Sequence, residues 1–169
     1  EMNDDVEALK VLHQLMAEDP SEVRVWKLGG MVALKKPEFT EFALDWTGEA
    51  VKYHGQNAGL VEQRAEALTL AGQVEAAWRF WQQLPATHSP AAAIGLLVCE
   101  VALDREPGAM HESVREKADA EFLRVYRRLL QWNAKGVLDA LNNRIEVLRA
   151  FVPKAAQMLE AAMAEAAHA

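Results

Sequence analysis

Two stretches of this chain correspond to each other at an offset of 34 or 35 residues, and a fixed period of this length is typical of proteins built from repeated helix pairs. The positions 35 apart are Trp26 and Val61, Gly30 and Ala65, and Ala33 and Leu68. The positions 34 apart are Ala43 and Ala77, Thr47 and Trp81, Ala50 and Leu84, and Gly55 and Ser89. One extra residue in the turn at 35–38 accounts for the difference. The period predicts a helical array, because a unit of this size buries its apolar face by stacking on its neighbours.

The residues at these positions resemble the tetratricopeptide repeat, whose first helix carries a large residue followed by small ones. In the first unit, Trp26 fills the large position, Gly30 the small position at the helix crossing, and Ala33 the position usually held by Tyr. In the second unit, Gly72 supplies the turn between the helices and Trp81 the large aromatic residue. Small residues are needed at the crossing because packed helices approach to about 8–10 Å.

The resemblance covers residues 4–104. It divides them into a half repeat at 4–20, repeats at 22–55 and 57–89, and a partial repeat at 90–104. Within the repeats, we expect Gly30 to pack against Ala43, and Ala65 against Ala77. The resemblance implies a right-handed superhelical array of antiparallel helix pairs.

Beyond Gly108 the repeat spacing is lost, but the helical periodicity continues. We therefore expect an all-α protein, with the repeat array in residues 1–108 and a C-terminal helical hairpin in 109–169 that caps it. The expected helices span 4–18, 22–36, 40–54, 58–71, 74–84, 90–104, 112–132, 134–150 and 153–167. Ser21 and Ser89 are predicted to cap helices, and Pro153 to kink or restart one. An alternative is that the apolar stripe from Leu138 to Leu159 is a dimerisation seam. In that case the chain forms a homodimer through its C-terminal helices.

The composition excludes several classes of function. The net charge of −7 argues against nucleic acid as a ligand, because phosphate binding needs clustered Lys and Arg. No apolar stretch reaches the length that membrane insertion requires. The single cysteine, Cys99, excludes an internal disulfide and fits a reducing compartment, so we expect a cytoplasmic location. Glu1 before Met2 and the initial half repeat leave open that the chain is part of a longer protein.

No arrangement of residues predicts catalysis, a metal or a cofactor. The histidines are His13, His54, His88, His111 and His168. None of them is three or four residues from another, so no helical metal pair is present. Cys99 lies among apolar residues and is interpreted as a buried thiol. The Asp45/Glu49 pair is interpreted as a solvated helix face. Arg124, Arg127 and Arg128 are interpreted as a solvated face that pairs with Glu121 and nearby acids; the alternative is a docking site for an acidic or phosphorylated partner.

The resemblance also implies a concave groove lined by the first helix of each repeat. Its predicted residues are Lys27, Met31, Leu34, Lys35, Glu62, Glu66, Thr69, Leu96, Glu100 and Leu103. Lys27 and Lys35 are similar to the lysines with which some family members hold a peptide carboxylate, but Met31 stands where Asn is needed, so we predict no chaperone binding. Phe39, Phe42, Trp46, Trp78 and Trp81 are interpreted as core between repeats. If some of them are exposed, the convex face becomes the interaction surface.

The predicted function is that of a scaffold or adaptor that binds a protein or peptide segment in this groove. The alternative is an accessory or assembly region of a larger protein, such as a repeat-containing glycosyltransferase, with self-association as one form of that assembly role.

Overall fold

The computed structural model describes residues 2–85 and 89–169, and its regular elements are all helical. His88, one of the five histidines considered as metal ligands, lies outside the described residues. The helices are α1 (Met2–Glu18), α2 (Val23–Ala33), the short 3₁₀ helix η1 (Pro37–Phe39), α3 (Thr40–Tyr53), α4 (Ala58–Leu70), α5 (Val74–Gln82), α6 (Pro90–Ala102), α7 (Glu112–Gln131), α8 (Lys135–Asn143), α9 (Ile145–Arg149) and α10 (Pro153–His168). The prediction of an all-α protein is confirmed.

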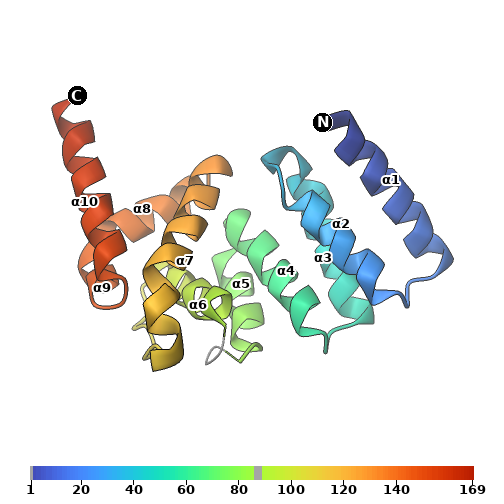
Figure 1. The fold of residues 1–169 in the computed structure, drawn as a ribbon, viewed down its shortest axis with the longest axis horizontal. Helices are drawn as coiled ribbons and strands as arrows, with labels where there is room; N and C mark the ends of the chain where they lie inside the picture. Colours follow the sequence, from blue (N-terminus) through green and yellow to red (C-terminus); the bar gives the residue numbers. More distant parts are fainter. Residues whose placement is uncertain (1, 86–88) are drawn as a thin grey trace.

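Consecutive helices pack against each other along the chain, and they form a row from α1 at one end to α10 at the other (Figure 1). Helix α2 also contacts α4, α4 contacts α6, and α6 contacts α8, because the odd-numbered helix between each pair lies to one side. Helices α2, α4, α6 and α8 therefore form one continuous layer.

The helix starts follow local capping chemistry, with one correction. Ser89 caps α6 as predicted: its side chain accepts a hydrogen bond from the Ala92 backbone N–H at 3.2 Å. The prediction that Ser21 caps α2 is wrong, because Glu22 occupies the N-cap and accepts from the Arg24 backbone N–H at 3.2 Å. The Ser21 hydroxyl instead donates to Asp19 at 2.6 Å.

Helices α4, α6 and α7 end in the same way. Gly72, Asp104 and Asn133 come after these helices with positive φ angles of 79°, 58° and 53°. At the end of α4, the Gly72 N–H bonds to the Thr69 carbonyl and the next N–H bonds to the Leu68 carbonyl. This pair of bonds satisfies carbonyl groups that the helix end leaves free, and it favours residues that tolerate the left-handed region.

The helix predicted at 134–150 is broken in two, which corrects the expectation of a simple C-terminal hairpin. Arg144 separates α8 from α9 with φ −116° and ψ 35°. Its guanidinium donates to the Val101 carbonyl at 3.1 Å and lies 3.2 Å from the Asp104 carboxylate. The break therefore coincides with a tertiary anchor to the end of α6. The restart at Pro153 is confirmed, since α10 begins there.

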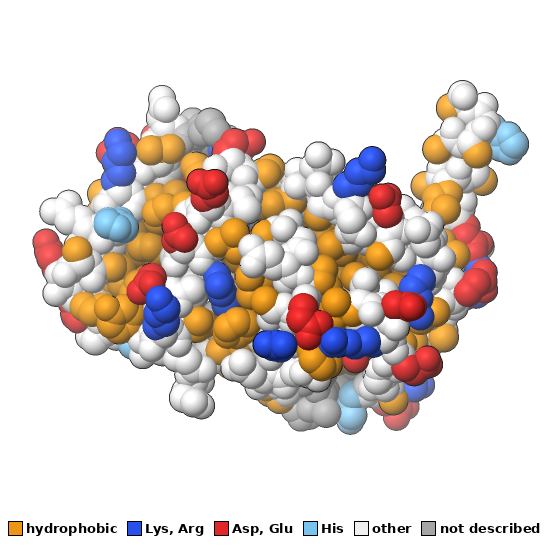
Figure 2. Space-filling view, turned by 180° about the vertical axis from the view of Figure 1, so that it is seen from behind, with side chains coloured by type: hydrophobic (Ala, Val, Ile, Leu, Met, Phe, Trp, Pro, Cys, Tyr) orange, Lys and Arg blue, Asp and Glu red, His pale blue; other side chains and the backbone are white. Residues whose placement is uncertain are grey.

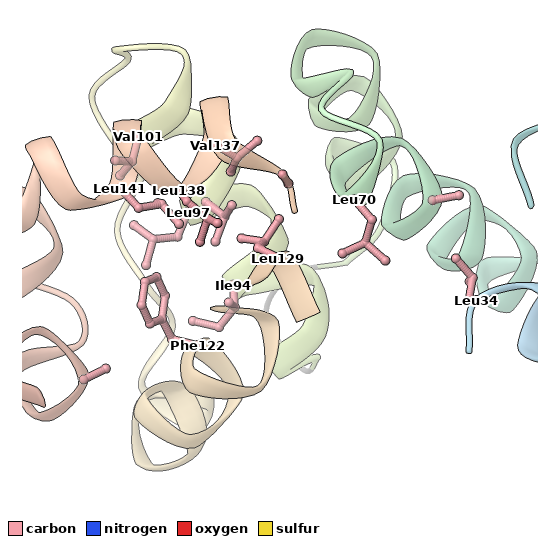
Figure 3. Close-up of a cluster of buried hydrophobic side chains, with 14 of the residues drawn as sticks. Leu34, Leu70, Ile94, Leu97, Val101, Phe122, Leu129, Val137, Leu138 and Leu141 are labelled. Atoms are coloured by element: carbon pink, nitrogen blue, oxygen red, sulfur yellow. The ribbon is translucent and has the colours of Figure 1, made fainter. Parts of the chain in front are cut away.

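The largest buried cluster crosses residue 108. It joins Leu34 and Leu70 of the N-terminal helices to Phe122 and Leu129 of α7 and to the inner faces of α8 and α10 (Figure 3). Two smaller clusters lie between α1, α2 and α3 and between α4, α5 and α6. The division of the chain at residue 108 stays a prediction.

Two glycines allow a tryptophan to approach a helix backbone closely. A Cβ at Gly29 would overlap the indole of Trp46, and a Cβ at Gly95 would overlap the indole of Trp81. We expected Gly30 to pack against Ala43. In the structure, a Cβ at Gly30 would overlap the side chain of Gln63 on α4, so Gln63 is the residue that packs closely on Gly30. Gly30 therefore serves the contact between α2 and α4.

Candidate functional site

The structure does not bring the residues of the predicted concave groove together as one open surface. Leu34 and Thr69 are buried at 5% and 3% exposure, which corrects their assignment to a partner-binding surface. Thr69 donates to the Ala65 carbonyl and accepts the indole N–H of Trp81 at 3.0 Å, so its hydroxyl has an internal role.

Glu62 and Glu66 of α4 face α7 rather than a partner. Arg128 donates to the Glu66 carboxylate and to the Leu34 carbonyl, and Arg124 lies 3.9 Å from Glu66. Burial raises the pKa of the Glu62 carboxyl, and the neighbouring Glu66 and Glu121 carboxylates raise it further. Glu62 interacts with Glu121 and Arg124, and Glu66, one turn later on α4, interacts with Arg124 and Arg128. The residue numbers rise together on the two helices, so α4 and α7 run parallel.

This arrangement results from the long connection at 103–111. It returns along α6, where Met110 and His111 line a small pocket together with Leu96, Glu100 and Phe151. Leu103, half-buried, is the C-cap of α6 at the start of the connection. Leu96 and Glu100 are therefore half-buried beside the chain's own connection, and α7 lies against α4 and α6.

Lys27, Met31 and Lys35 of the predicted groove remain exposed on α2 and just after it. The Lys35 and Lys36 ammonium groups each lie 3.4 Å from a carboxylate oxygen of Asp5 on α1. Desolvation alone raises the pKa of Asp5, but the two ammonium groups outweigh it and hold the pKa below its ordinary value. Lys35 therefore belongs to an α1–α2 ion pair, and a binding role for Lys27 and Met31 stays a prediction.

The arginine cluster of α7 is largely satisfied within the chain. Arg124 forms a bidentate contact with Glu121, its shortest distance being 2.7 Å, as predicted. Arg128 pairs with Glu66 and also lies over the Trp132 ring, 4.9 Å from its centroid. Arg124 and Arg128 thus attach α7 to α4, whereas Arg127 is exposed and takes no part in these ion pairs, so a docking role for the cluster stays a prediction.

An open groove lies elsewhere, between α1 and α3. We call it the α1–α3 groove, and it has two halves that share His13 and Phe42. The aromatic half has a volume of about 340 Å³ and is lined by His13, Met16, Ala17, Pro20, Trp26, Phe42, Asp45, Trp46, Glu49 and Tyr53. The aliphatic half has a volume of about 370 Å³ and is lined by Val6, Leu9, Lys10, His13, Glu38, Phe39 and Phe42. In Figure 2, this end of the molecule shows hydrophobic side chains beside a row of acidic ones.

The floor of the aromatic half is fixed by stacking and by internal hydrogen bonds. The Trp26 and Trp46 rings lie 4.7 Å apart, and Tyr53 stacks on Trp26 at 5.8 Å. The Trp26 indole donates to the Pro20 carbonyl and the Trp46 indole to the Trp26 carbonyl, both at 2.8 Å. His54 also contacts the Pro20 carbonyl, at 3.0 Å. The tryptophans are therefore held rigidly, and their indole N–H groups are directed to the backbone.

The interpretation of the second-helix aromatics as core holds for part of the set. Trp46 and Trp81 are buried at 5%, whereas Phe42 is half-buried and faces the groove. Tyr53, which is 57% exposed at the end of α3, was not among the predicted residues. The available signal was the row of Phe42, Asp45, Trp46 and Glu49, whose spacing places aromatic and acidic groups along one side of a helix.

A metal site and a membrane span find no support in residues 2–85 and 89–169. No group of three or more His, Cys, Asp and Glu side chains within these ranges is placed to hold a metal ion. None of the helices described is both long and apolar enough to span a bilayer. Cys99 is fully buried, and burial raises the pKa of its thiol to about 12, which agrees with its interpretation as an inert interior thiol.

Comparison of the chain with family models, with curated proteins and with solved structures gave no match.

Proposed function

We propose that this chain is a tetratricopeptide-like helical array that acts as a protein-binding scaffold, and that it holds a segment of its partner in the α1–α3 groove. The observation that carries the proposal is the groove itself: two adjoining apolar cavities, open to solvent, over a rigid aromatic floor. Rigid aromatic side chains are preferred anchors at binding surfaces because they offer large contact areas with few rotatable bonds.

The length of the groove suits a peptide segment. Along α1, the lining residues run from Val6 to Ala17, with Pro20 in the turn after the helix. At 1.5 Å per helical residue, this span is about 16 Å. A short helix or an extended segment of a few residues matches that length, and binding of a segment in an apolar groove is a common mode of recognition.

The predicted concave site is the weaker candidate, because α7 bonds to its α4 part and the connection at 103–111 lies against its α6 part, which leaves both parts half-buried or buried. Only Lys27, Met31 and the paired Lys35 remain exposed there. The proposal therefore moves the binding surface to the α1–α3 side while keeping the scaffold role.

A pair of substitutions to tryptophan tests the proposal. The immobilised full chain would select binders from a random-peptide display library, and the selected peptides would then be titrated against Ala17→Trp and Met31→Trp. Both residues are exposed helical positions, so both variants should fold, which circular dichroism checks. We expect Ala17→Trp to weaken binding by at least about tenfold, because the indole fills the groove, and Met31→Trp to leave binding unchanged.

The opposite pattern would locate the site on the exposed face of α2. Equal binding by both variants and the wild type would contradict the proposal, because it would place recognition outside both surfaces.

A second candidate function is self-association through α10, and it rests on a specific observation. Helix α10 projects from the body of the molecule (Figures 1 and 2). Met158 and Met163 on it are 53% and 44% exposed, while Leu159 between them is buried. Sedimentation equilibrium of the wild type and of the Met158→Glu/Met163→Glu variant tests it: a dimer that the variant loses would support assembly, and a monomeric wild type would reject it.

A further inference from the structure

We infer that the segment held in the α1–α3 groove is basic: a Lys or Arg side chain enters the aromatic half between Asp45 and Glu49, and an apolar side chain fills the aliphatic half. This inference rests on the proposed function and adds the chemistry of the partner.

The aromatic half of the groove carries negative charge. Its lining includes the Asp45 and Glu49 carboxylates and neither Lys nor Arg. These two acids are four residues apart on α3, so they lie on the same side of the helix. Glu49 contacts Lys52 at 2.9 Å, but both side chains are exposed and the pair is weak. Asp45 forms no salt bridge within the described part of the chain. The Arg64 guanidinium attracts it, but Arg64 donates its hydrogen bonds to the Leu44 carbonyl and the Thr47 hydroxyl, so the Asp45 carboxylate still accepts a cation from the groove.

In the aromatic half, the tryptophans offer no hydrogen-bond donor to an anion, which leaves the Tyr53 hydroxyl and the His13 ring as the donors of the lining. The indole N–H groups of Trp26 and Trp46 are used by backbone carbonyls. An acidic segment would therefore meet two carboxylates and would gain no compensation from the tryptophans. A cation gains from both the carboxylates and the ring quadrupoles of the aromatic side chains.

The aliphatic half differs from the aromatic half in its charge. Its lining contains one cation, Lys10, and one carboxylate, Glu38, so these charges balance. Most of its other lining residues are apolar: Val6, Leu9, Phe39 and Phe42. Along α1, the centres of the two halves lie about 8 Å apart, which is about one and a half helical turns. A partner segment that places one apolar side chain and one basic side chain at this separation satisfies both halves at once.

The experiment uses the random-peptide display library on the immobilised full chain. We expect the selected peptides to be enriched in Lys and Arg, with an apolar residue at a constant offset from the basic one. The double variant Asp45→Asn/Glu49→Gln keeps the shape of the groove and removes its charge. It should bind the selected peptides about tenfold more weakly, and the loss should shrink at high salt.

A matched control separates local from overall charge. Glu116 and Asp139 are exposed acids outside the groove, and Glu116→Gln/Asp139→Asn changes the net charge by the same amount. This control should bind as the wild type does. An equal loss in the control would overturn the inference, because the attraction would then be due to the charge of the whole chain.

Two further outcomes distinguish failure of this inference from failure of the proposed function. In the first outcome, Ala17→Trp weakens the binding of the selected peptides, but these peptides lack basic residues or bind Asp45→Asn/Glu49→Gln as tightly as the wild type. This would overturn the inference of a basic partner and leave the groove as the binding site. In the second outcome, Ala17→Trp leaves peptide binding unchanged, which would overturn both the proposed groove site and the inference of a basic partner.

Discussion

The two faces of the helical row differ in the length of the connections between their helices. On the α4–α6 face, the connection at 103–111 returns along α6, and α7 then lies against both helices, with Arg128 bonded to Glu66 of α4. At the α1–α3 groove, short turns connect the helices, and no described helix covers the space between α1 and α3. The comparison teaches that, in this chain, the face beside the long connection is covered and the face beside the short turns remains open. Substitutions on the α4–α6 face, taken in order of decreasing effect, measure how firmly that face is closed.

The largest effect is expected from Phe122→Ala on α7. Phe122 is fully buried in the largest cluster, so its truncation should lower the free energy of unfolding by about 3–5 kcal/mol. Leu130→Ala on the same helix is the control: this side chain is 55% exposed, and we expect a change within about 0.5 kcal/mol. Denaturation in urea measures both. A loss below about 1 kcal/mol for Phe122→Ala would show that α7 is a detachable cover and not part of the core.

Arg128→Met should have an intermediate effect. It removes the bonds to Glu66 and the Leu34 carbonyl and leaves these partly buried acceptors without their partner. We expect the free energy of unfolding to fall by about 1–3 kcal/mol. Arg127 is exposed on the neighbouring position, and Arg127→Met should be nearly neutral. Equal values for the two variants would mean that the α4–α7 ion pairs contribute nothing to closing this face.

The smallest effect is expected from Glu62→Gln, and it has the opposite sign. Burial and the nearby carboxylates raise the pKa of Glu62 in the folded protein above its ordinary 4.5. The folded state therefore binds the proton more tightly, and stability falls as the pH rises from the ordinary pKa through the raised one. Removing the charge should stabilise the protein at neutral pH, by less than about 1 kcal/mol because the site is partly solvated.

The pH dependence checks this mechanism. The gain of Glu62→Gln should vanish below the ordinary pKa of 4.5, where the wild-type carboxyl is protonated in both states. Glu116→Gln, at an exposed position of α7, should show no such dependence. A gain that persists at low pH would mean that shape, not charge, explains the effect.

With the exception of the cap at Ser21, the sequence predicted the helix ends that local chemistry decides. Gly72, the Ser89 cap and Pro153 mark helix ends because their backbone or side-chain preferences act within a few residues. The break at Arg144 and the position of α7 were not predicted, because each depends on a contact with a distant part of the chain. The bond from Arg128 to Glu66 spans 62 residues, and the repeat pattern carries no information about it.

The candidate site was only partly predictable for the same reason. The pattern of Phe42, Asp45, Trp46 and Glu49 was visible, but each residue had an ordinary interpretation as core or solvated face. Only the position of α1 beside α3 turns these residues into one groove and adds Tyr53 to its edge.

The most direct measurement uses an environment-sensitive fluorophore attached at Ala17→Cys in one sample and at Met31→Cys in another. The native Cys99 should not react, because it is fully buried and its pKa is about 12. Addition of a library-selected basic peptide should change the emission of the label at position 17 and leave the label at position 31 unchanged. A response at position 31 alone would contradict the account and return the binding site to the face that the repeat pattern predicted.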